Sequence, residues 1–287
     1  MLAIYKKELR SYFNSMIGYV FMAFFLLIIG VYFFVQNLFY GYANFEYTLS
    51  SITFIFVILA PLLTMRLMAE ENKQKTDQLL LTSPVTATSI VVGKLLAVFS
   101  LYGFIMLITC FYPLILSLYG TVTFATAYSS ILAFTLMGGA YLAIGLFISS
   151  LTDSQIVAAV ISFVVFLLTI LMDGIAGVLP TDNKSAVIIF TAFLLILCII
   201  LYRMMHNLTI AAGIGVIGEA ALVAAYLLKP TFFDGSVANV LGWLSIVKRF
   251  DNFYYGIFDV AGLVYYVSIA GLFTFLTVQV IKKKRWS

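Results

Sequence analysis

Long apolar stretches separated by short polar ones run along almost the whole chain. Six of them hold about 20 or more mostly apolar residues, the length that an α-helix needs to cross the hydrocarbon core of a bilayer. They cover residues 16–36, 50–69, 88–119, 124–151, 155–179 and 259–281. Two further stretches, 186–203 and 208–228, would form an extra helical hairpin. The pattern predicts an all-α integral membrane protein with six transmembrane helices, and leaves open whether the hairpin at 186–228 adds two more.

The first 16 residues carry a different pattern. On a helical wheel their apolar side chains fall within one arc, and the basic side chains of Lys6, Lys7 and Arg10 lie opposite. Only Ile4 departs from this division. We therefore expect residues 1–16 to form an amphipathic helix in the membrane interface. The stretch is too charged for the apolar core of a cleavable signal peptide, so the first span is expected to be retained as an anchor.

Composition places the chain in lipid rather than in water. Hydrophobic residues make up 63% and charged residues 10% of the sequence, whereas soluble globular proteins carry about 25% charged residues. We expect one membrane domain over residues 1–287 and no soluble domain. The sequence has no P-loop, and its single histidine and two cysteines lack metal-ligand spacing. The expectation is a protein that is no enzyme, binds no metal or cofactor itself and binds no nucleic acid.

Basic residues set the expected orientation. If residue 1 is cytoplasmic and all eight stretches cross, twelve of the sixteen Lys and Arg residues lie on the cytoplasmic side. The four on the outer side are Lys184, Lys229, Lys248 and Arg249. Because positive charge favours the cytoplasmic side, both ends of the chain are expected there. Omitting the hairpin removes two crossings and leaves this prediction unchanged.

The loop at 70–87, between the second and third spans, holds the most informative polar sequence. It starts with charged residues from Glu70 to Asp77, continues with three leucines and is broken at Thr82-Ser83-Pro84. A short helix with charged and apolar faces is suited to docking in a groove of a soluble partner. A solvated turn between two spans is the alternative reading of the same residues.

The segment AEENKQKTDQLLLTSPVTATSIVVGKLLA, residues 69–97, resembles the loop after the second span of ABC-2 type permeases. The gliding-motility and multicopper-enzyme-maturation permeases are the most similar subgroup. The matching positions are Glu70, Glu71, Thr76, Asp77, Leu79 to Leu81, Thr82, Pro84, Gly93 and Lys94. Lys75 stands where that family usually has glycine, which favours a helical turn there over an open one. The resemblance covers about 1–180 and 229–287, and the hairpin at 186–228 looks like an insertion.

The resemblance implies a division of labour between subunits. This chain would be the permease half of an exporter in a prokaryotic plasma membrane, paired with a second permease subunit as a homodimer or heterodimer. A separate soluble ABC ATPase, which binds ATP and Mg²⁺, would drive it, and an accessory extracytoplasmic subunit is a further partner. The residues that would couple to the ATPase are Glu70, Glu71, Lys73, Lys75, Thr76, Asp77, Leu80, Thr82, Ser83 and Pro84.

Two acidic residues within apolar stretches are candidates for a transport pathway. Glu219 and Asp173 would be costly to expose to lipid, so we expect Glu219 to face protein. The aromatic segment at 229–258 suits either an outer re-entrant segment or an interfacial belt. A secondary, ion-coupled transporter is the alternative function, but it would need repeats or several midplane polar residues. A membrane-embedded enzyme would need paired catalytic residues at membrane depth, and a lipid, peptide, antibiotic or polysaccharide substrate would each fit.

Overall fold

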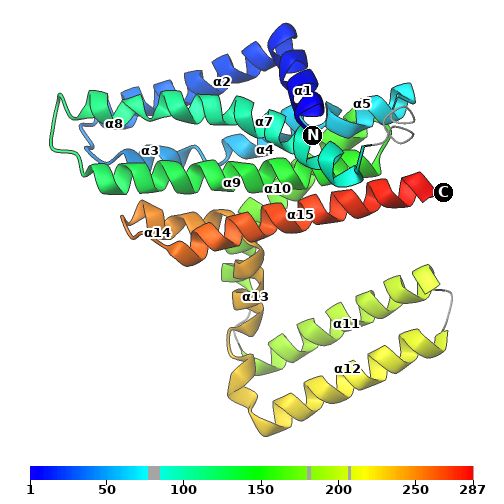
Figure 1. Cartoon of the computed structure of the whole chain (residues 1–287). Coiled ribbons are helices and arrows are strands. Elements are labelled where there is room, and N and C mark those ends of the chain that lie inside the picture. Colours follow the sequence, from blue (N-terminus) through cyan, green and yellow to red (C-terminus); the bar gives the residue numbers. More distant parts are fainter. Residues whose placement is uncertain (77–84, 180–181, 206–207, 287) are drawn as a thin grey trace. The chain divides into compact units, whose positions relative to one another are not determined.

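The computed structural model describes residues 1–76, 85–179, 182–205 and 208–286, and every regular element in these ranges is a helix (Figure 1). Its contacts divide the chain into two compact units. Unit 1 is Met1–Leu168 with Ile246–Ser287, and unit 2 is Thr169–Ser245. The predicted all-α class is thus confirmed for the described residues.

Unit 1 holds the elements before the hairpin and the last helix. Its helices are α1 (Leu2–Asn14), α2 (Met16–Tyr32), η1 (Phe33–Phe39), α3 (Phe45–Ser51), α4 (Ile55–Thr64), α5 (Arg66–Gln74), α7 (Ala87–Thr109), α8 (Phe111–Leu116), α9 (Phe124–Leu151), η3 (Val247–Phe250), α14 (Asp251–Tyr254) and α15 (Val260–Trp286). Helix α10 (Gln155–Val178) starts in unit 1 and ends in unit 2. Unit 2 continues with α11 (Asn183–Met205), α12 (Leu208–Leu228), η2 (Pro230–Phe233) and α13 (Ser236–Leu244).

Five helical stretches of the described chain are long and apolar enough to cross a membrane. They are Met16–Phe39, Ala87–Leu116, Phe124–Leu151, Gln155–Val178 and Val260–Arg285. The predicted second span corresponds to a bent helix pair, Phe45–Ser51 and Ile55–Gln74, with an angle of 65° between them, and crossing by this pair stays a prediction. The chain is therefore a multi-pass membrane protein, and crossing by the hairpin stays a prediction.

A buried polar network lies at the first helix of this bent pair. The Asn37 side chain, in the π-helical turn η1, donates hydrogen bonds to the carbonyls of Tyr42 (2.7 Å) and Asn44 (3.3 Å). The Thr48 hydroxyl donates to Asn37 Oδ1 at 2.6 Å. Asn37 and Thr48 are both buried. Since an unpaired amide is costly away from water, the network fixes α3 against the end of the first span.

Helix α9 is the centre of unit 1 and packs against α15, α7, α4 and α5. Within its apolar span 72% is buried, against 17% in α15. Two glycines allow this packing. A Cβ at Gly138 would overlap the Tyr102 ring on α7, and one at Gly145 would overlap the Thr64 side chain on α4. Small residues that let helix backbones approach closely are typical of membrane helix interfaces.

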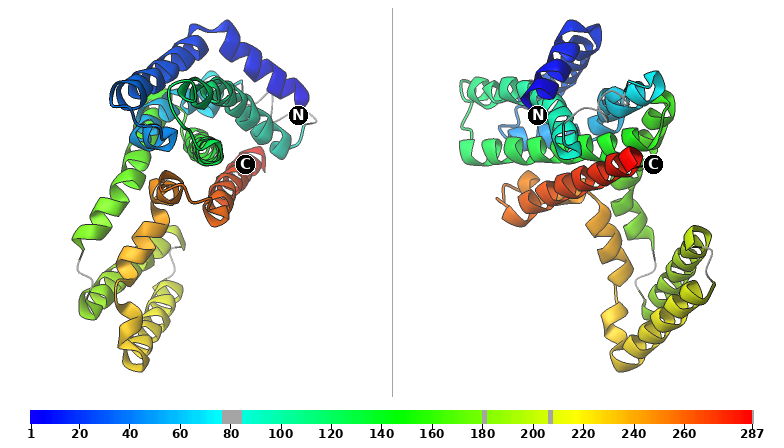
Figure 2. Two further views of the ribbon diagram at one scale, coloured as in Figure 1. Left: turned by 90° about the vertical axis from the view of Figure 1, so that its left-hand side faces the viewer. Right: turned by 45° about the vertical axis from the view of Figure 1, so that its right-hand side comes forward.

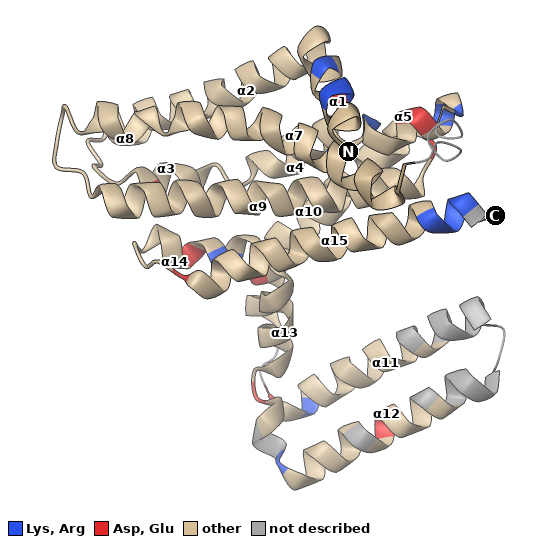
Figure 3. Cartoon of the chain, in the orientation of Figure 1, with Lys and Arg blue, Asp and Glu red and all other residues tan. Residues whose placement is uncertain are grey.

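The charged residues of unit 1 gather at two opposite ends of its long helices (Figure 3). One group lies where α1, α5 and the last turns of α15 meet, and the other lies around α14. The helix bodies between the two groups carry almost no charge, which is the distribution that a bilayer demands. Figures 1 and 2 show both chain ends at the first of these groups. That arrangement agrees with termini on one side of the membrane, and which side this is stays a prediction.

Unit 2 contains the hairpin of α11 and α12, which pack against each other. The Thr191 hydroxyl on α11 donates a hydrogen bond to Glu219 Oε1 on α12 at 3.0 Å. Glu219 is half-buried and contacts α11 through this bond, and whether it faces protein rather than lipid stays a prediction. Asp173 is exposed on the part of α10 that belongs to unit 2. A pathway role for either acid stays a prediction.

The segment at 229–258 forms short helices that are divided between the two units. Its end is fixed by Asp259, whose carboxylate accepts hydrogen bonds from Ala261 N (2.9 Å) and from the Asn252 side chain (2.7 Å). These contacts, with that of Asn252 the largest, lower the pKa of Asp259. Asp259 thus caps the N-terminus of α15. Re-entry of the segment into the membrane stays a prediction.

Candidate functional site

A buried lysine joins three helices at the charged end of unit 1 that carries both chain ends. The side chain of Lys94, on α7, is 1% exposed. Its Nζ donates to Leu67 O at 2.7 Å, and lies 3.1 Å from Glu8 Oε1 on α1 and 2.9 Å from Glu71 Oε2 on α5. An ammonium group has three donors, so all three are used. Glu8 and Glu71 are 12% and 14% exposed, which makes this a largely desolvated ion cluster.

Lys7 completes the cluster from the water side. Its Nζ lies 3.1 Å from Glu71 Oε1 and 3.6 Å from Glu8 Oε1. Burial works to lower the pKa of Lys7, but attraction by Glu71 and Glu8 outweighs it, and the pKa is raised. Lys7 is therefore a cation at neutral pH. We call Lys7, Glu8, Glu71 and Lys94 the Lys94 cluster; its two cations balance its two carboxylates.

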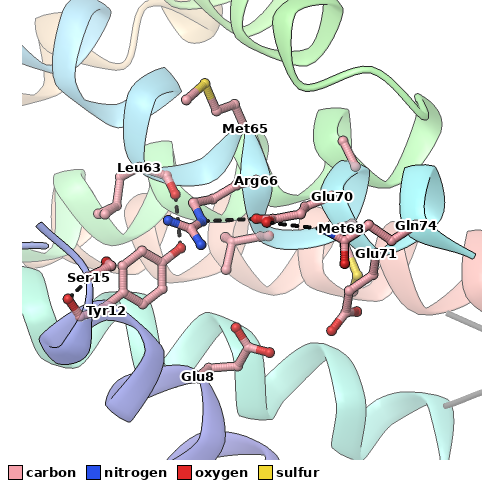
Figure 4. Close-up of polar contacts among 12 residues, drawn as sticks. Glu8, Tyr12, Ser15, Leu63, Met65, Arg66, Met68, Glu70, Glu71 and Gln74 are labelled. Atoms are coloured by element: carbon pink, nitrogen blue, oxygen red, sulfur yellow. Dashed lines mark hydrogen bonds and ion pairs between the residues drawn. The ribbon is translucent and has the colours of Figure 1, made fainter. Parts of the chain in front are cut away.

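A second polar group lies beside the Lys94 cluster (Figure 4). Arg66 Nε donates to Glu70 Oε2 at 3.1 Å, and the guanidinium lies 5.7 Å from the centroid of the Tyr12 ring. The Tyr12 hydroxyl donates to Leu63 O at 3.1 Å. Burial raises the pKa of Tyr12 well above its usual value, so the phenol stays a neutral donor. These contacts tie α1 to the start of α5.

A polar cavity of about 300 Å³ lies among these groups. Charged and polar side chains of α1, α5 and α7 line it, and they come from both groups. The lining residues are Lys7, Glu8, Ser11, Tyr12, Arg66, Leu67, Glu70, Glu71, Gln74, Thr76 and Lys94. The space between α1 and α5 is therefore polar where the neighbouring helix bodies are apolar.

One face of helix α1 contacts protein, which its amphipathic pattern does not predict. Ile4 and Tyr12 are buried, and Glu8 between them binds Lys94. Leu2 and Arg10 are both exposed. Residues at i, i+4 and i+8 share a face, so Ile4, which departs from the amphipathic pattern, belongs to the side that contacts protein. That spacing is the signal by which Glu8 could have been found.

The contact of α1 with α7 is close. A Cβ at Gly93 would lie 3.3 Å from the Ile4 side chain and 3.3 Å from the Met1 carbonyl. A glycine immediately before Lys94 thus lets α1 approach near enough for Glu8 to reach the Lys94 ammonium.

Helix α5 is a separate helix because α9 supplies its N-terminal cap. Ser149 Oγ accepts hydrogen bonds from the backbone N–H groups of Met68 and Ala69, both at 3.1 Å. The same hydroxyl donates to Met65 O at 3.0 Å. The first four N–H groups of a helix have no partner within it, and here a neighbouring helix satisfies two of them. The regular helical hydrogen bonding between α4 and α5 is therefore interrupted at Met65, within the stretch Ile55–Gln74.

The other end of α5 overturns one expectation. The helix ends at Gln74, and Lys75 adopts the left-handed conformation, with φ +57°. Its N–H bonds to Asn72 O, and that of Thr76 bonds to Glu71 O. This pair of hydrogen bonds defines a Schellman motif, in which glycine usually takes the left-handed position. The prediction of a helical turn at Lys75 is wrong, because the closing bonds outweigh the preference of lysine.

Replacing Lys75 by glycine is expected to stabilise the protein by up to about 1 kcal/mol, because a left-handed conformation costs a side-chain-bearing residue about that much. Glycine also makes the unfolded chain more flexible, which reduces the gain. The thermal unfolding midpoint in detergent measures the effect. Lys73→Gly is the matched control: it lies inside α5 and should lower stability by about 1 kcal/mol. A lower midpoint for Lys75→Gly would contradict the interpretation.

The residues predicted to couple this chain to a partner differ in their exposure to solvent. Lys73, Lys75 and Thr76 are exposed, whereas Glu71 points into the Lys94 cluster and Glu70 binds Arg66. The remaining predicted residues lie outside the described residues: Asp77, Leu80, Thr82, Ser83 and Pro84. On α1, Lys6 and Arg10 are exposed and Lys7 joins the cluster. Sequence reasoning missed Glu8, Arg66 and Ser149.

Comparison with known protein families matches the part of the chain that holds most of these residues. A family model described as "ABC-2 family transporter protein" matches residues 35–228. The match includes Glu71, Lys94 and Ser149, and it begins after α1. It also runs through the hairpin at 186–228 and stops before 229–287, so the expected coverage, with the hairpin as an insertion, is not borne out. No curated protein matches the chain.

Proposed function

Since the chain belongs to the ABC-2 family of transporter proteins, and so is a non-catalytic membrane permease subunit, we propose that a separate ATPase drives it from the end where α1, α5 and the last turns of α15 meet. The ATPase would bind the exposed side of α5 and the loop that follows it. ATP and Mg²⁺ would be bound by that partner. The permease would work as a dimer and export its substrate.

The position of Glu71 carries the proposal. Glu71 lies in the last turns of α5, two residues before the exposed Lys73. Its carboxylate contacts Lys94 on α7 and Lys7 on α1, and its carbonyl accepts the N–H of Thr76 at the start of the loop. A partner that moves the loop would therefore pull on a charged contact with two other helices. Movement at the surface would reach α1 and the start of the third span together.

Orientation and location follow from the same proposal. The end that bears α1, α5 and the end of α15 would be cytoplasmic, because Lys and Arg gather there (Figure 3). The exposed residues Lys6 and Arg10 would lie at the headgroups of a prokaryotic plasma membrane. Kinship with the gliding-motility and multicopper-enzyme-maturation permeases, and an accessory extracytoplasmic subunit, are further parts of the proposal.

The test is recovery of an ATPase with the tagged chain from detergent-solubilised membranes. The partner should carry a P-loop and hydrolyse ATP. The double variant Lys73→Glu, Lys75→Glu should lower its recovery at least tenfold, because both side chains are exposed at the proposed docking face.

The control for that test is Lys282→Glu, Lys283→Glu. It changes charge equally at two exposed positions on α15, and recovery should stay within twofold of the parent chain. Equal loss in both variants would contradict docking at α5. Recovery of no P-loop protein, together with transport that does not require ATP, would favour the ion-coupled alternative.

A further inference from the structure

Two cations near the end of α15 contact backbone carbonyls elsewhere in unit 1, one on α9 and one just before α7. Lys284 Nζ donates to Ser150 O at 3.1 Å, and Arg285 Nη1 donates to Val85 O at 3.2 Å. Ser150 is in the last turn of α9, which ends at Leu151. Val85 is the first described residue after 77–84. The last turn of α15 thus touches both the end of its main packing partner and the chain that leaves the loop.

The contact with Ser150 has a clear physical basis. The last four carbonyls of a helix have no N–H partner within it, and a cation near them interacts favourably with the helix dipole. Lys284 is half-buried, and it satisfies one of these carbonyls. Because α15 packs against α9, the bond fixes the last turn of one helix to the last turn of the other.

The contact with Val85 lies at the entry to α7. The next residue, Thr86, is the N-cap of α7, and its Oγ1 accepts the N–H of Ser89 at 3.3 Å. Arg285 therefore holds the backbone directly before a capped helix. At the opposite end of the loop, the Thr76 N–H is bonded to Glu71 O. Each described end of the loop is thus bonded to a different part of unit 1.

We propose that Lys284 and Arg285 are positioning residues that hold the returning end of the loop against α15 and α9, so that movement of the loop reaches α15 as well as α7. The inference rests on the proposed function, because it assumes an ATPase that moves the loop. It adds a second route from the loop, separate from the one through the Lys94 cluster. One route starts before residue 77 and leads to α1 and α7, and the other starts after residue 84 and leads to α9 and α15.

The same basic run has an ordinary alternative role. Four cations at the membrane surface, Lys282 to Arg285, would attract anionic lipid whatever their individual contacts. If lipid attraction is their role, replacing any of the four should have nearly the same effect. The proposed contacts involve only Lys284 and Arg285. Lys282 and Lys283 are exposed and adjacent, so they provide a matched pair with the same charge.

The experiment uses the chain together with its ATPase in lipid nanodiscs, and compares Lys284→Ala, Arg285→Ala with Lys282→Ala, Lys283→Ala. The first pair should lower the stimulation of ATP hydrolysis by the permease at least fivefold, with the amount of bound ATPase unchanged. The second pair should change stimulation less than twofold. Equal effects of the two pairs would overturn the proposal in favour of lipid attraction.

A second measurement replaces the contact by a covalent bond. Val85→Cys with Arg285→Cys, in a background with Cys110 and Cys198 replaced by alanine, should form a disulfide on oxidation. The oxidised chain should regain at least half of the parent's stimulation of ATP hydrolysis, and reduction should abolish this gain. Stimulation that stays equally low before and after oxidation would overturn the proposal. If the parent chain binds no ATPase, the proposed function fails. If the ATPase binds and both pairs of substitutions leave its stimulation intact, only this inference is overturned.

Discussion

Replacing Lys94 by methionine is expected to lower the free energy of unfolding of unit 1 by about 3–5 kcal/mol, the usual cost of removing one partner from a buried ion pair. The reason is the state of the carboxylates that remain. Glu8 and Glu71 are each less than 15% exposed, with side-chain exposures of 12% and 14%. Without the ammonium they face each other with only Lys7 as a counter-charge. Methionine keeps the length of the side chain, so the change isolates the charge and its three hydrogen bonds.

Thermal unfolding in detergent, followed by size-exclusion chromatography, measures this loss. Lys7→Met is the matched control: it removes a lysine from the same cluster, but one whose side chain is 63% exposed, and exposed ion pairs contribute about 0–1 kcal/mol. The triple variant Lys94→Met, Glu8→Gln, Glu71→Gln should recover most of the stability, because no buried charge is then left uncompensated. If Lys94→Met unfolds at the temperature of Lys7→Met, the cluster is not the desolvated site that its geometry indicates.

The second large effect is expected from Ser149→Ala, at about 2–4 kcal/mol, since each buried group that loses its hydrogen bond costs about 1–3 kcal/mol. One hydroxyl satisfies the N–H groups of Met68 and Ala69 and donates to Met65 O. Its loss leaves the start of α5 without a cap. Because α5 leads to Glu71 and the loop, stimulation of the ATPase should fall as well.

Ser150→Ala is the control that the chain itself offers. Ser150 is the next residue on α9 and is also buried, but its hydroxyl donates to Phe147 O within its own helix. A backbone carbonyl inside a helix has another partner, so the loss should stay below about 1 kcal/mol. Similar midpoints for the two variants in detergent would show that capping from α9 does not hold α5 in place.

Hydropathy located five long apolar helices of the described chain, because lipid imposes a length and a polarity that a single sequence displays. It could not show where the second span breaks. The cap on α5 comes from Ser149, 80 residues further along the chain from Ala69, and a contact of that kind leaves no mark in the local pattern. The buried bond between Asn37 and Thr48 near that bend is equally hidden, because both look like ordinary polar residues near the end of a span.

The candidate site was only partly readable for a related reason. Glu70 and Glu71 look alike in sequence, yet one binds Arg66 and the other Lys94. Glu8 looked like one more charge on a basic helix, although its spacing from Ile4 and Tyr12 marks the face that packs on α7. At Lys75 the residue type favoured a helical turn, and the two closing hydrogen bonds decided otherwise.

The Lys94 cluster also imposes an order on biosynthesis. Glu8 is made 86 residues before Lys94, so α1 emerges from the ribosome with Lys7 as a partner but long before the buried cation exists. Until the start of the third span has been translated, the charge of Glu8 and Glu71 would be balanced only in part. Delivery of Lys94 to the bilayer edge would then complete the charge balance together with Lys7 and fix α1 in one step. Early spans would accordingly stay loosely associated during translation, and the third would complete their packing.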